Sequence, residues 1–282
     1  MTQREEFSMH AGRVNPVIVN YRTPDLVLKC VSSILAHGVA AAEDIIVVEN
    51  ASPDDSAMRL RESLPSRVQL VVAERNAGFS SGINIGLQHV SREFVLVLNP
   101  DTYFVDTSIE RALALLDEAR DVGLVGLDLI YPDGERQYSA RRFYSVLDII
   151  GRRLPIGKYW PVRQRVDRHM MKSDWRSGEP FPAEWVMGTG FVIRRELFQR
   201  LDGMDEAYFL YMEDVDLCAR VWEAGYKVMC VPGARLVHDH QRSSAQNPLG
   251  RTGRMHLKSL EIFRRKYRLP LLVPPGVHGL KR

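Results

Sequence analysis

The sequence has few cysteines and no long apolar run. Its 282 residues include only Cys30, Cys218 and Cys230, which lie far apart and form no Cys-x-x-Cys pair. This spacing argues against a zinc site or a disulfide framework and is typical of a reducing compartment. No apolar run reaches the roughly 20 residues that a transmembrane helix needs. The polar segment 1–13 lacks the apolar core of a signal peptide, so we expect a flexible tail on a cytoplasmic protein.

Strong charge and glycine-rich phosphate loops are missing as well. The formal net charge of +3 is weak, which argues against nucleic acid as the main partner. The turn after the first expected strand has the sequence NYRTPD, which contains neither GxGxxG nor GxxxxGK[ST]. A cradle of glycine amides is therefore absent there. A bound diphosphate would need another source of positive charge, such as a metal ion held by Asp101.

Expected strands and helices alternate through the first half of the chain. Short apolar runs predict strands at 14–21, 45–48, 68–72 and 94–98, and amphipathic segments predict helices at 24–37, 55–64, 80–89 and 108–119. Alternation at this spacing is typical of βαβ units. It predicts an α/β fold with a mostly parallel, Rossmann-like central sheet flanked by helices.

Polar clusters follow three of these strands. They are Asn20-Tyr21-Arg22, Glu49-Asn50 and Asn99 with Asp101. Pro100 cannot continue a central strand, so Asp101 lies at the carboxyl end of the run 94–98. The carboxyl ends of parallel strands share one edge, where open α/β sheets bind ligands. A carboxylate at this edge is suited to hold a divalent cation and, through it, a phosphate. Taken alone, Asp101 could equally be a solvated turn residue.

The second half contains three further candidate features. Apolar residues flank Gly188-Thr189-Gly190, which permits close approach of a ligand or of another backbone. Glu213, Asp214 and Asp216 fall in the first turn of an expected helix, where they could supply a general base or simply favour the helix dipole, and we favour the second role for Asp216. In His238-Asp239-His240, a metal-binding role and a structural role are equally open.

Two segments suggest contacts outside the sheet. The irregular stretch 141–182, rich in Arg with interleaved aromatic residues, could be an acceptor-binding insertion, a membrane-facing flap or a surface excursion. Residues 251–268 predict a basic amphipathic helix. That helix could touch anionic lipid, giving peripheral contact with the inner face of the cell membrane, or it could pack on the body with a solvated basic face.

Motifs in a consistent order carry a resemblance to a known family. They are VIVNY from Val17, VVENASPDDS from Val47, RNAGF from Arg75 with GINIG from Gly82, LNPD ending at Asp101, Gly188-Thr189-Gly190, and Glu213-Asp214. Over residues 16–244 the chain resembles the inverting glycosyltransferases of the GT-A fold, family two, and especially their rhamnosyltransferase-like branch. Asn99 stands where the DxD motif has its first Asp, a form that this branch often shares. Glu49 replaces the more usual Asp.

The resemblance implies a role for each matching residue. The nucleotide-sugar site would comprise Asn20, Tyr21, Arg22, Glu49, Asn76, Gly78, Phe79, Asn84, Asn99 and Asp101. Asp101, with His238 as a further candidate ligand, would bind Mg²⁺ or Mn²⁺. Asp214 would be the catalytic base, supported by Glu213, and Trp185, Gly188, Thr189 and Gly190 would lie on the acceptor side.

The same resemblance implies a domain plan and a reaction. Residues 14–126 would form the nucleotide-sugar half, 127–245 the acceptor half with its insertion at 141–182, and 246–282 a basic helix and tail. The expected reaction moves a sugar, best guessed as L-rhamnose from dTDP-rhamnose, to a glycan or lipid-linked glycan in cell-surface polysaccharide synthesis. A UDP-sugar donor, and a non-catalytic nucleotide-sugar or glycan-binding protein on the same fold, remain alternatives. A nucleotidyltransferase is a weaker one, because NYRTPD is not its glycine-rich loop.

Overall fold

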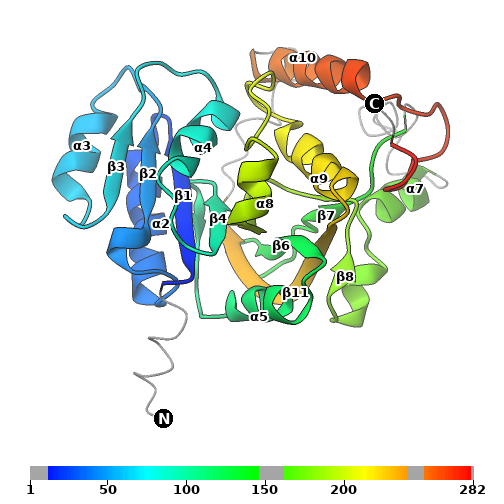
Figure 1. The fold of residues 1–282 in the computed structure, drawn as a ribbon, viewed down its shortest axis with the longest axis horizontal. Helices are drawn as coiled ribbons and strands as arrows, with labels where there is room; N and C mark the ends of the chain where they lie inside the picture. Colours follow the sequence, from blue (N-terminus) through cyan, green and yellow to red (C-terminus); the bar gives the residue numbers. More distant parts are fainter. Residues whose placement is uncertain (1–11, 146–161, 240–250, 281–282) are drawn as a thin grey trace, which may run out of the picture.

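The protein is built around one large mixed sheet with helices on both faces (Figure 1). The computed structural model describes residues 12–145, 162–239 and 251–280. The strands are β1 (Val14–Asn20), β2 (Ile46–Glu49), β3 (Gln69–Val72), β4 (Phe94–Leu98), β5 (Thr102–Tyr103), β6 (Val122–Ile130), β7 (Ala140–Arg141), β8 (Phe181–Pro182), β9 (Trp185–Val186), β10 (Gly190–Arg194) and β11 (Lys227–His238). The α-helices are α2 (Pro24–Ala36), α3 (Ser56–Ser63), α4 (Phe79–Leu87), α5 (Glu110–Glu118), α7 (Val162–His169), α8 (Arg195–Arg200), α9 (Glu213–Glu223) and α10 (Arg251–Lys266).

Nine strands form the main sheet in the order β3-β2-β1-β4-β10-β6-β11-β5, with β8 paired to β11. The first four strands in this order are parallel, as expected from the alternating pattern. Strand β10 is antiparallel to β4 and β6, so the second half of the sheet is mixed. The direction of β10 follows from where it begins, because Gly190 pairs with Leu98 at the carboxyl end of β4. β10 therefore starts at the edge that carries Asn99 and Asp101.

One strand joins two apolar runs of the sequence. Residues 227–231 and 235–237, which are separated by Pro232-Gly233-Ala234, belong to the single strand β11. The pairing of β11 with β6 shifts register between Cys230 and Arg235, where Gly233 has a positive φ of 82°. This irregularity interrupts the apolar pattern but not the strand, because a bulge bends a strand without ending it. β11 thereby reaches β5, next to Asp101.

Two apolar cores cover the two faces of the sheet. Helices α2 and α5 pack on one face, where Ile34 and Leu113 are buried. Helices α4, α8 and α9 pack on the other, where the buried side chains include Ile83, Phe198 and Leu217. Because both faces are covered, the strands read as continuous apolar runs in the sequence.

A close backbone contact joins the turn before α4 to the segment before α9. The Phe79 amide donates a hydrogen bond to the Phe209 carbonyl at 2.9 Å, and the Ser80 hydroxyl donates to the Tyr208 carbonyl at 2.9 Å. Gly78 has a φ of +104°, and a Cβ there would lie 2.4 Å from the Phe209 oxygen. Only glycine satisfies both constraints. Residues from the two halves of the chain are thus held together beside α9.

The C-terminal helix α10 packs on the body through its apolar face. Phe263 and Tyr267 are fully buried, whereas Arg254, Lys258 and Arg265 are exposed. The structure thus shows a helix that packs on the body and has its basic face in solvent. No helix in the described parts of the chain combines the length and apolar character needed to cross a membrane.

The expected N-terminal tail and the irregular stretch 141–182 lie partly within the described residues. Arg13, placed in the expected tail, makes ion pairs with Glu93 and Asp117 at 2.9 and 2.7 Å, and so fastens the start of β1. Within 141–182, Trp175 is buried in the same apolar core as α9, and its ring contacts Phe181 edge-on. The expectations for 1–11, 146–161 and His240 lie outside the described residues.

Candidate active site

The polar residues after β1 and β2 mainly bind one another. Asn20 and Glu49 are fully buried, and the Asn20 amide donates to one oxygen of Glu49. The Ser52 amide donates to the other oxygen at 2.6 Å. Both carboxylate oxygens of Glu49 are therefore engaged inside the protein. Glu49 shapes the loop after β2, and the exposed residues Tyr21 and Arg22 stand at the rim of this edge.

A second cluster shapes the turn before α4. Asn76 accepts hydrogen bonds from the Gly78 amide at 3.0 Å and from the Asn50 side chain at 3.2 Å. Asn50 also donates to the Gly78 carbonyl at 3.0 Å. The Oδ1 atom of Asn50 is buried, and it accepts no hydrogen bond from any described residue. A buried acceptor without a partner at a strand end is a candidate ligand contact.

Asn84, expected beside these residues, instead forms hydrogen bonds with the turn after α8. Its side chain donates to the Met204 carbonyl at 2.8 Å and to Glu206 at 3.0 Å, and it accepts from the Met204 amide at 2.8 Å. These bonds hold the turn after α8, where a Cβ on Gly203 would lie 2.2 Å from Asn84. The amide is thus satisfied away from the strand-end cluster, and its expected place in that cluster is not what the structure shows.

Asp101 and His238 come together because β5 pairs with the end of β11. Nε2 of His238 lies 3.3 Å from Oδ2 of Asp101, and the Asp239 amide donates to the Asp101 carbonyl at 2.9 Å. The Oδ1 atom of Asp101 is buried and accepts no hydrogen bond within the described chain. The two expected metal ligands are therefore adjacent, and one carboxylate oxygen remains for a further ligand.

Gln137 orients the His238 ring and was missed by the sequence reasoning. Its Nε2 donates to the His238 carbonyl at 2.8 Å, which turns its Oε1 toward the ring Nδ1 at 2.7 Å. With Nδ1 as the donor, a neutral ring presents the Nε2 lone pair to Asp101. A cation between the two groups would stabilise this arrangement, and such an outer partner is usual for a metal-binding histidine.

The side chains of Asp101 and His238 can hold a divalent ion only if a bound ligand supplies further coordinating atoms. One imidazole and one carboxylate are suitable for Mn²⁺, and less so for Mg²⁺, which prefers oxygen. Among the residues the structure describes, no three His, Cys, Asp or Glu side chains form a metal-binding group. Diphosphate oxygens would have to complete the coordination.

The Gly188-Thr189-Gly190 segment connects this edge to Asp214. The Asn99 amide donates to the Thr189 carbonyl at 2.9 Å, and the Gly188 amide donates to Oδ2 of Asp214 at 2.9 Å. Both glycines leave little room for a side chain, because a Cβ at Gly188 would lie 3.2 Å from the Cβ of Asp214, and one at Gly190 would lie 2.3 Å from a methyl group of Leu236. The end of β4 is thus connected to the Asp214 carboxylate through two hydrogen bonds and the backbone of Gly188 and Thr189.

Glu213 and Asp214 experience different surroundings. Burial, and then the charge of Asp214, raise the pKa of Glu213 well above its ordinary value. Burial also raises the pKa of Asp214, but the amides of Gly188 and Val215 donate to its two oxygens and oppose that rise. Oε2 of Glu213 has no hydrogen-bond partner among the described residues. We infer that Glu213 keeps its proton while Asp214 carries the negative charge.

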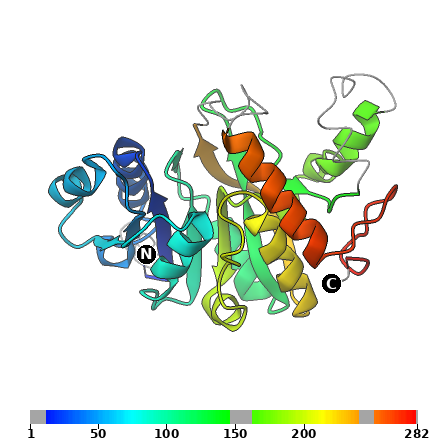
Figure 2. The same cartoon turned by 90° about the horizontal axis from the view of Figure 1, so that it is seen from above.

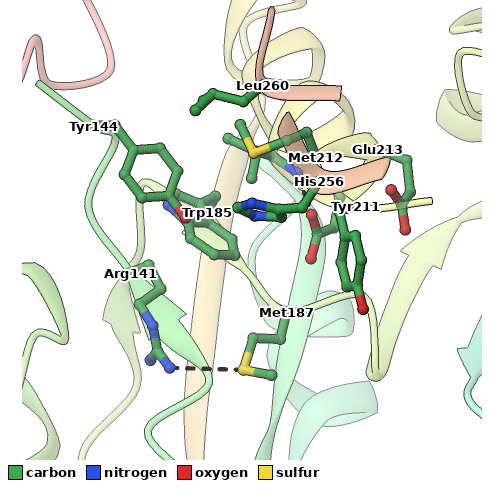
Figure 3. Close-up of a pocket in the computed structure, with 11 residues that line it drawn as sticks. Arg141, Tyr144, Trp185, Met187, Tyr211, Met212, Glu213, His256 and Leu260 are labelled. Carbon is green, nitrogen blue, oxygen red and sulfur yellow. Dashed lines mark hydrogen bonds between the residues drawn. The ribbon is translucent and has the colours of Figure 1, made fainter. Parts of the chain in front are cut away.

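The two carboxyl groups line a cavity of about 340 Å³. Figure 3 shows Tyr144 and Trp185 on one side of His256, and Tyr211 and Glu213 on the other. The remaining lining residues are Arg141, Met187, Met212, Asp214, Val215 and Leu260. Trp185, expected on the acceptor side, is fixed by a 2.8 Å hydrogen bond from its indole to the Arg142 carbonyl. Aromatic and sulfur-containing walls around a few polar groups are typical of small-molecule sites.

Strained backbone leads into this cavity. Tyr211 and Met212 both have a φ of 70°, which is costly for side chains of this size. Helix α10 supports the turn, because the Ser259 hydroxyl donates to the Leu210 carbonyl at 2.7 Å and the His256 ring meets Tyr211 edge-on at 5.1 Å. The strain fixes the entry into α9 and hence the position of Glu213 and Asp214.

Asp216 is a buried hub and not a helix-dipole charge, which corrects the sequence expectation. It is fully buried and forms ion pairs with Arg220 at 2.7 Å and with Lys266 at 2.5 Å. The Tyr267 hydroxyl lies 3.2 Å away and that of Tyr208 3.4 Å away. Partners on α9, on α10 and in the preceding loop converge on one carboxylate. The sequence pattern missed this role because Lys266 and Tyr267 are distant in the chain.

Comparison with known proteins decides the family. Residues 12–252 match the family model described as "Glycosyltransferase like family 2". The chain belongs to this family. The N-acetylglucosaminyl-diphospho-decaprenol L-rhamnosyltransferase of Mycobacterium tuberculosis is 27% identical over 89% of this chain and 83% of its own length. The rhamnosyltransferase WbbL of Escherichia coli is 26% identical over 80% of this chain and 89% of its own length.

A solved structure supports the fold of this glycosyltransferase. The mannosyltransferase PcManGT from Pyrobaculum calidifontis, in complex with GDP-Man and Mn²⁺, superposes with a TM-score of 0.62. The match covers 96% of this chain and 69% of that one at 16% identity, so it is a likeness of fold. The expected GT-A fold and the resemblance to the rhamnosyltransferase-like branch are confirmed.

Several residues of the glycosyltransferase cavity carried no signal in the sequence. Arg141 and Tyr144 come from the irregular segment after β7, while His256 and Leu260 come from α10. None of them lies in a motif of the family, and all are far from Glu213 in the chain. The interleaved Arg and aromatic residues after position 141 were the one available hint.

The first prediction concerns stability and pH. Because the pKa of Glu213 is raised, the folded protein holds a proton that the unfolded chain releases above about pH 4.5. The free energy of unfolding should therefore fall as pH rises from there through the raised pKa, by at most about 1.4 kcal/mol per pH unit. Glu213→Gln should remove this contribution in urea titrations, and Glu118→Gln, an exposed control, should not. Equal slopes in wild type and Glu213→Gln would contradict the assignment.

The second prediction concerns the Asp216 hub. Asp216→Asn leaves the buried Arg220 without its counter-charge and leaves Lys266 paired with Asp205 alone, so we expect a loss of about 3–5 kcal/mol in the free energy of unfolding. Glu261→Gln, which breaks the exposed ion pairs of Glu261 with Arg264 and Arg265 on α10, is the control and should change the free energy of unfolding little. Urea titration of both variants at neutral pH is the measurement. Comparable losses in the two would show that Asp216 is not a hub.

Proposed function

We propose that this glycosyltransferase transfers a sugar, with inversion, from a nucleotide diphosphate donor to a hydroxyl group of a glycan or lipid-linked glycan in cell-surface polysaccharide synthesis. The observation that carries the proposal is the Gly188 segment, which bonds to the end of β4 and to Asp214. A carboxylate suited to a proton transfer thereby lies near the edge where a diphosphate would bind. L-Rhamnose from dTDP-rhamnose is our choice of donor, because the relatives named above are rhamnosyltransferases.

The chain's own residues account for the transfer of the acceptor proton. In the proposed reaction the acceptor hydroxyl enters the cavity and its oxygen attacks the anomeric carbon. Asp214 takes the hydroxyl proton while the bond from that carbon to the diphosphate oxygen breaks. The Gly188 and Val215 amides hold the carboxylate in one orientation. Burial raises its pKa, which makes it a stronger base than an exposed aspartate.

Asp101 and His238 would hold the metal ion, Mg²⁺ or Mn²⁺. When bound, such an ion supplies positive charge that stabilises the diphosphate as it leaves. The unpartnered Oδ1 of Asp101 and the orientation of the His238 ring support this role. Asn50, Asn76 and Gly78 shape the neighbouring loop, on which we place the nucleotide. Asn99 contributes its backbone to this edge through its bond to Thr189.

A non-catalytic nucleotide-sugar-binding protein on the same fold would need no base. The Glu213-Asp214 pair favours the enzyme, because burying two adjacent carboxyl groups destabilises a protein that has no use for them. A UDP-sugar donor differs from dTDP-rhamnose in base, ribose and sugar. Donor hydrolysis or transfer, measured with each donor and with and without metal, separates these alternatives.

The third prediction tests the base. Asp214→Asn keeps the shape of the side chain but cannot accept the proton, so turnover should fall by about 10²–10⁴-fold while donor affinity changes little. Glu213→Gln should keep much more activity, because burial already raises the pKa of Glu213 and favours its neutral form. Asp133→Asn, at an exposed turn, is the control for the chemical change. Near-normal turnover of Asp214→Asn would refute the role.

The fourth prediction tests the metal site by thermal shift. A ligand that binds only the folded state raises the melting temperature. dTDP-rhamnose should raise it in the wild type only with Mn²⁺ or Mg²⁺ present, and this rise should be lost in Asp101→Ala and reduced in His238→Ala. Asp239→Asn changes the neighbouring carboxylate, which pairs with Lys29 at 3.4 Å, and should behave as wild type. A metal-independent rise of the same size in the wild type would exclude the role of Asp101.

A further inference from the structure

Three consecutive aliphatic side chains after α10 are exposed to solvent. Leu271, Leu272 and Val273 are 67%, 58% and 70% exposed, more than any other large apolar side chain in the described residues. Single exposed apolar residues are common on protein surfaces, but a contiguous group usually marks a contact site. We call residues 271–273 the apolar tip.

The segment that carries the apolar tip is anchored at its base. Leu269 and Val277 pack against the core, and Leu280 is buried. Arg165 on α7 donates a hydrogen bond to the Leu272 carbonyl. Figures 1 and 2 show this red segment extending beyond the C-terminal end of α10, next to α7. The backbone of the tip is therefore held while its side chains point to solvent.

Prolines stiffen this segment. Pro270 precedes the apolar tip, and Pro274 and Pro275 follow it. Because proline restricts the backbone of the unfolded as well as the folded chain, holding the tip in one conformation costs less conformational entropy. The tip cannot easily fold back to cover its own side chains.

Positive charge is concentrated beside the apolar tip. Residues 251–268 contain seven Lys or Arg residues and one Glu, whereas the whole chain has a net charge of only +3. The exposed cations with described side chains are Arg254, Lys258, Arg264, Arg265 and Arg268. Arg254, Lys258 and Arg265 recur at helical spacing along the outer face of α10, opposite the buried Phe263, and Arg268 follows the end of the helix. The apolar face of α10 is thus occupied by the body and cannot itself enter a membrane.

We propose that the apolar tip and the outer face of α10 form a docking surface for an anionic lipid bilayer. The aliphatic side chains insert at the boundary of the acyl chains, and the cations lie against the phosphate headgroups. A second copy of the chain fits this surface less well, because it would bring two cationic faces together. The surface goes beyond the sequence expectation, which assigned lipid contact to the helix alone.

Helix α10 connects the docking surface to the cavity that contains Asp214. Helix α10 also supplies His256 and Leu260 to the wall beside Asp214. Its 16 residues span about 24 Å. Docking through α10 therefore holds the cavity close to the lipid surface, where a lipid-linked acceptor would present its sugar. This consequence rests on the proposed function, whereas binding to lipid does not.

The test is binding to vesicles, measured without donor or acceptor. The full chain should co-sediment with vesicles of phosphatidylglycerol and phosphatidylcholine, and much less with phosphatidylcholine alone. The triple variant Leu271→Ser/Leu272→Ser/Val273→Ser should lose about tenfold or more in partition coefficient. Arg254→Gln/Lys258→Gln/Arg268→Gln should lose binding to the anionic vesicles only, as should high salt in the wild type. Met58→Ser, which removes an exposed apolar side chain on α3, is the control and should bind as wild type.

Two results would overturn the proposal. One is equal vesicle binding by the wild type and the tip variant. The other is a wild-type dimer in solution that the tip variant converts to a monomer, because the tip would then be covered by a second copy. Transfer to a water-soluble acceptor should be unchanged in the tip variant. Loss of docking is thereby distinguished from loss of catalysis.

Discussion

The hydrogen bond from the Gly188 amide to the Asp214 carboxylate is the contact on which the site depends. It exists because β10 runs antiparallel to β4 and begins at the carboxyl end of that strand. The loop before β10 therefore lies beside Asn99, and α9 can present its first turn to that loop. If β10 were parallel to its neighbours, the loop would lie at the opposite edge of the sheet. The mixed sheet is thus needed to bring the carboxylates of Asp101 and Asp214 to the same edge.

The three acidic residues in the first turn of α9 have different surroundings. Burial raises the pKa of Glu213, whose Oε2 has no hydrogen-bond partner among the described residues, whereas two amide hydrogen bonds oppose the same effect of burial on Asp214. Asp216, on the far side of the same turn, is neutralised by Arg220 and Lys266. One short acidic sequence thereby supplies a carboxyl group that favours its protonated form, the carboxylate that we propose as the base, and a structural anchor. The assignment follows from the partners of each carboxyl group and not from its position in the helix.

Helix α10 connects the cavity to the rest of the molecule in three ways. It supports the strained turn at Tyr211, closes the Asp216 hub through Lys266, and contributes His256 to the cavity wall. Its outer face carries the cations and leads to the apolar tip. A contact made on the outside of this helix therefore lies a single helix diameter from the proposed reaction centre.

The sequence alone determined the class of fold and the family, and it predicted the residues on which we place most of the proposed chemistry. Alternating apolar and amphipathic runs are local patterns, and motifs such as LNPD ending at Asp101 sit at strand ends that can be located without a structure. The tertiary structure alone decided the direction of β10, the support of His238 by Gln137, the inward roles of Glu49 and Asn84, and the hub at Asp216. Each of these depends on partners distant in the chain, and a local pattern does not encode which distant groups will satisfy a buried charge or amide.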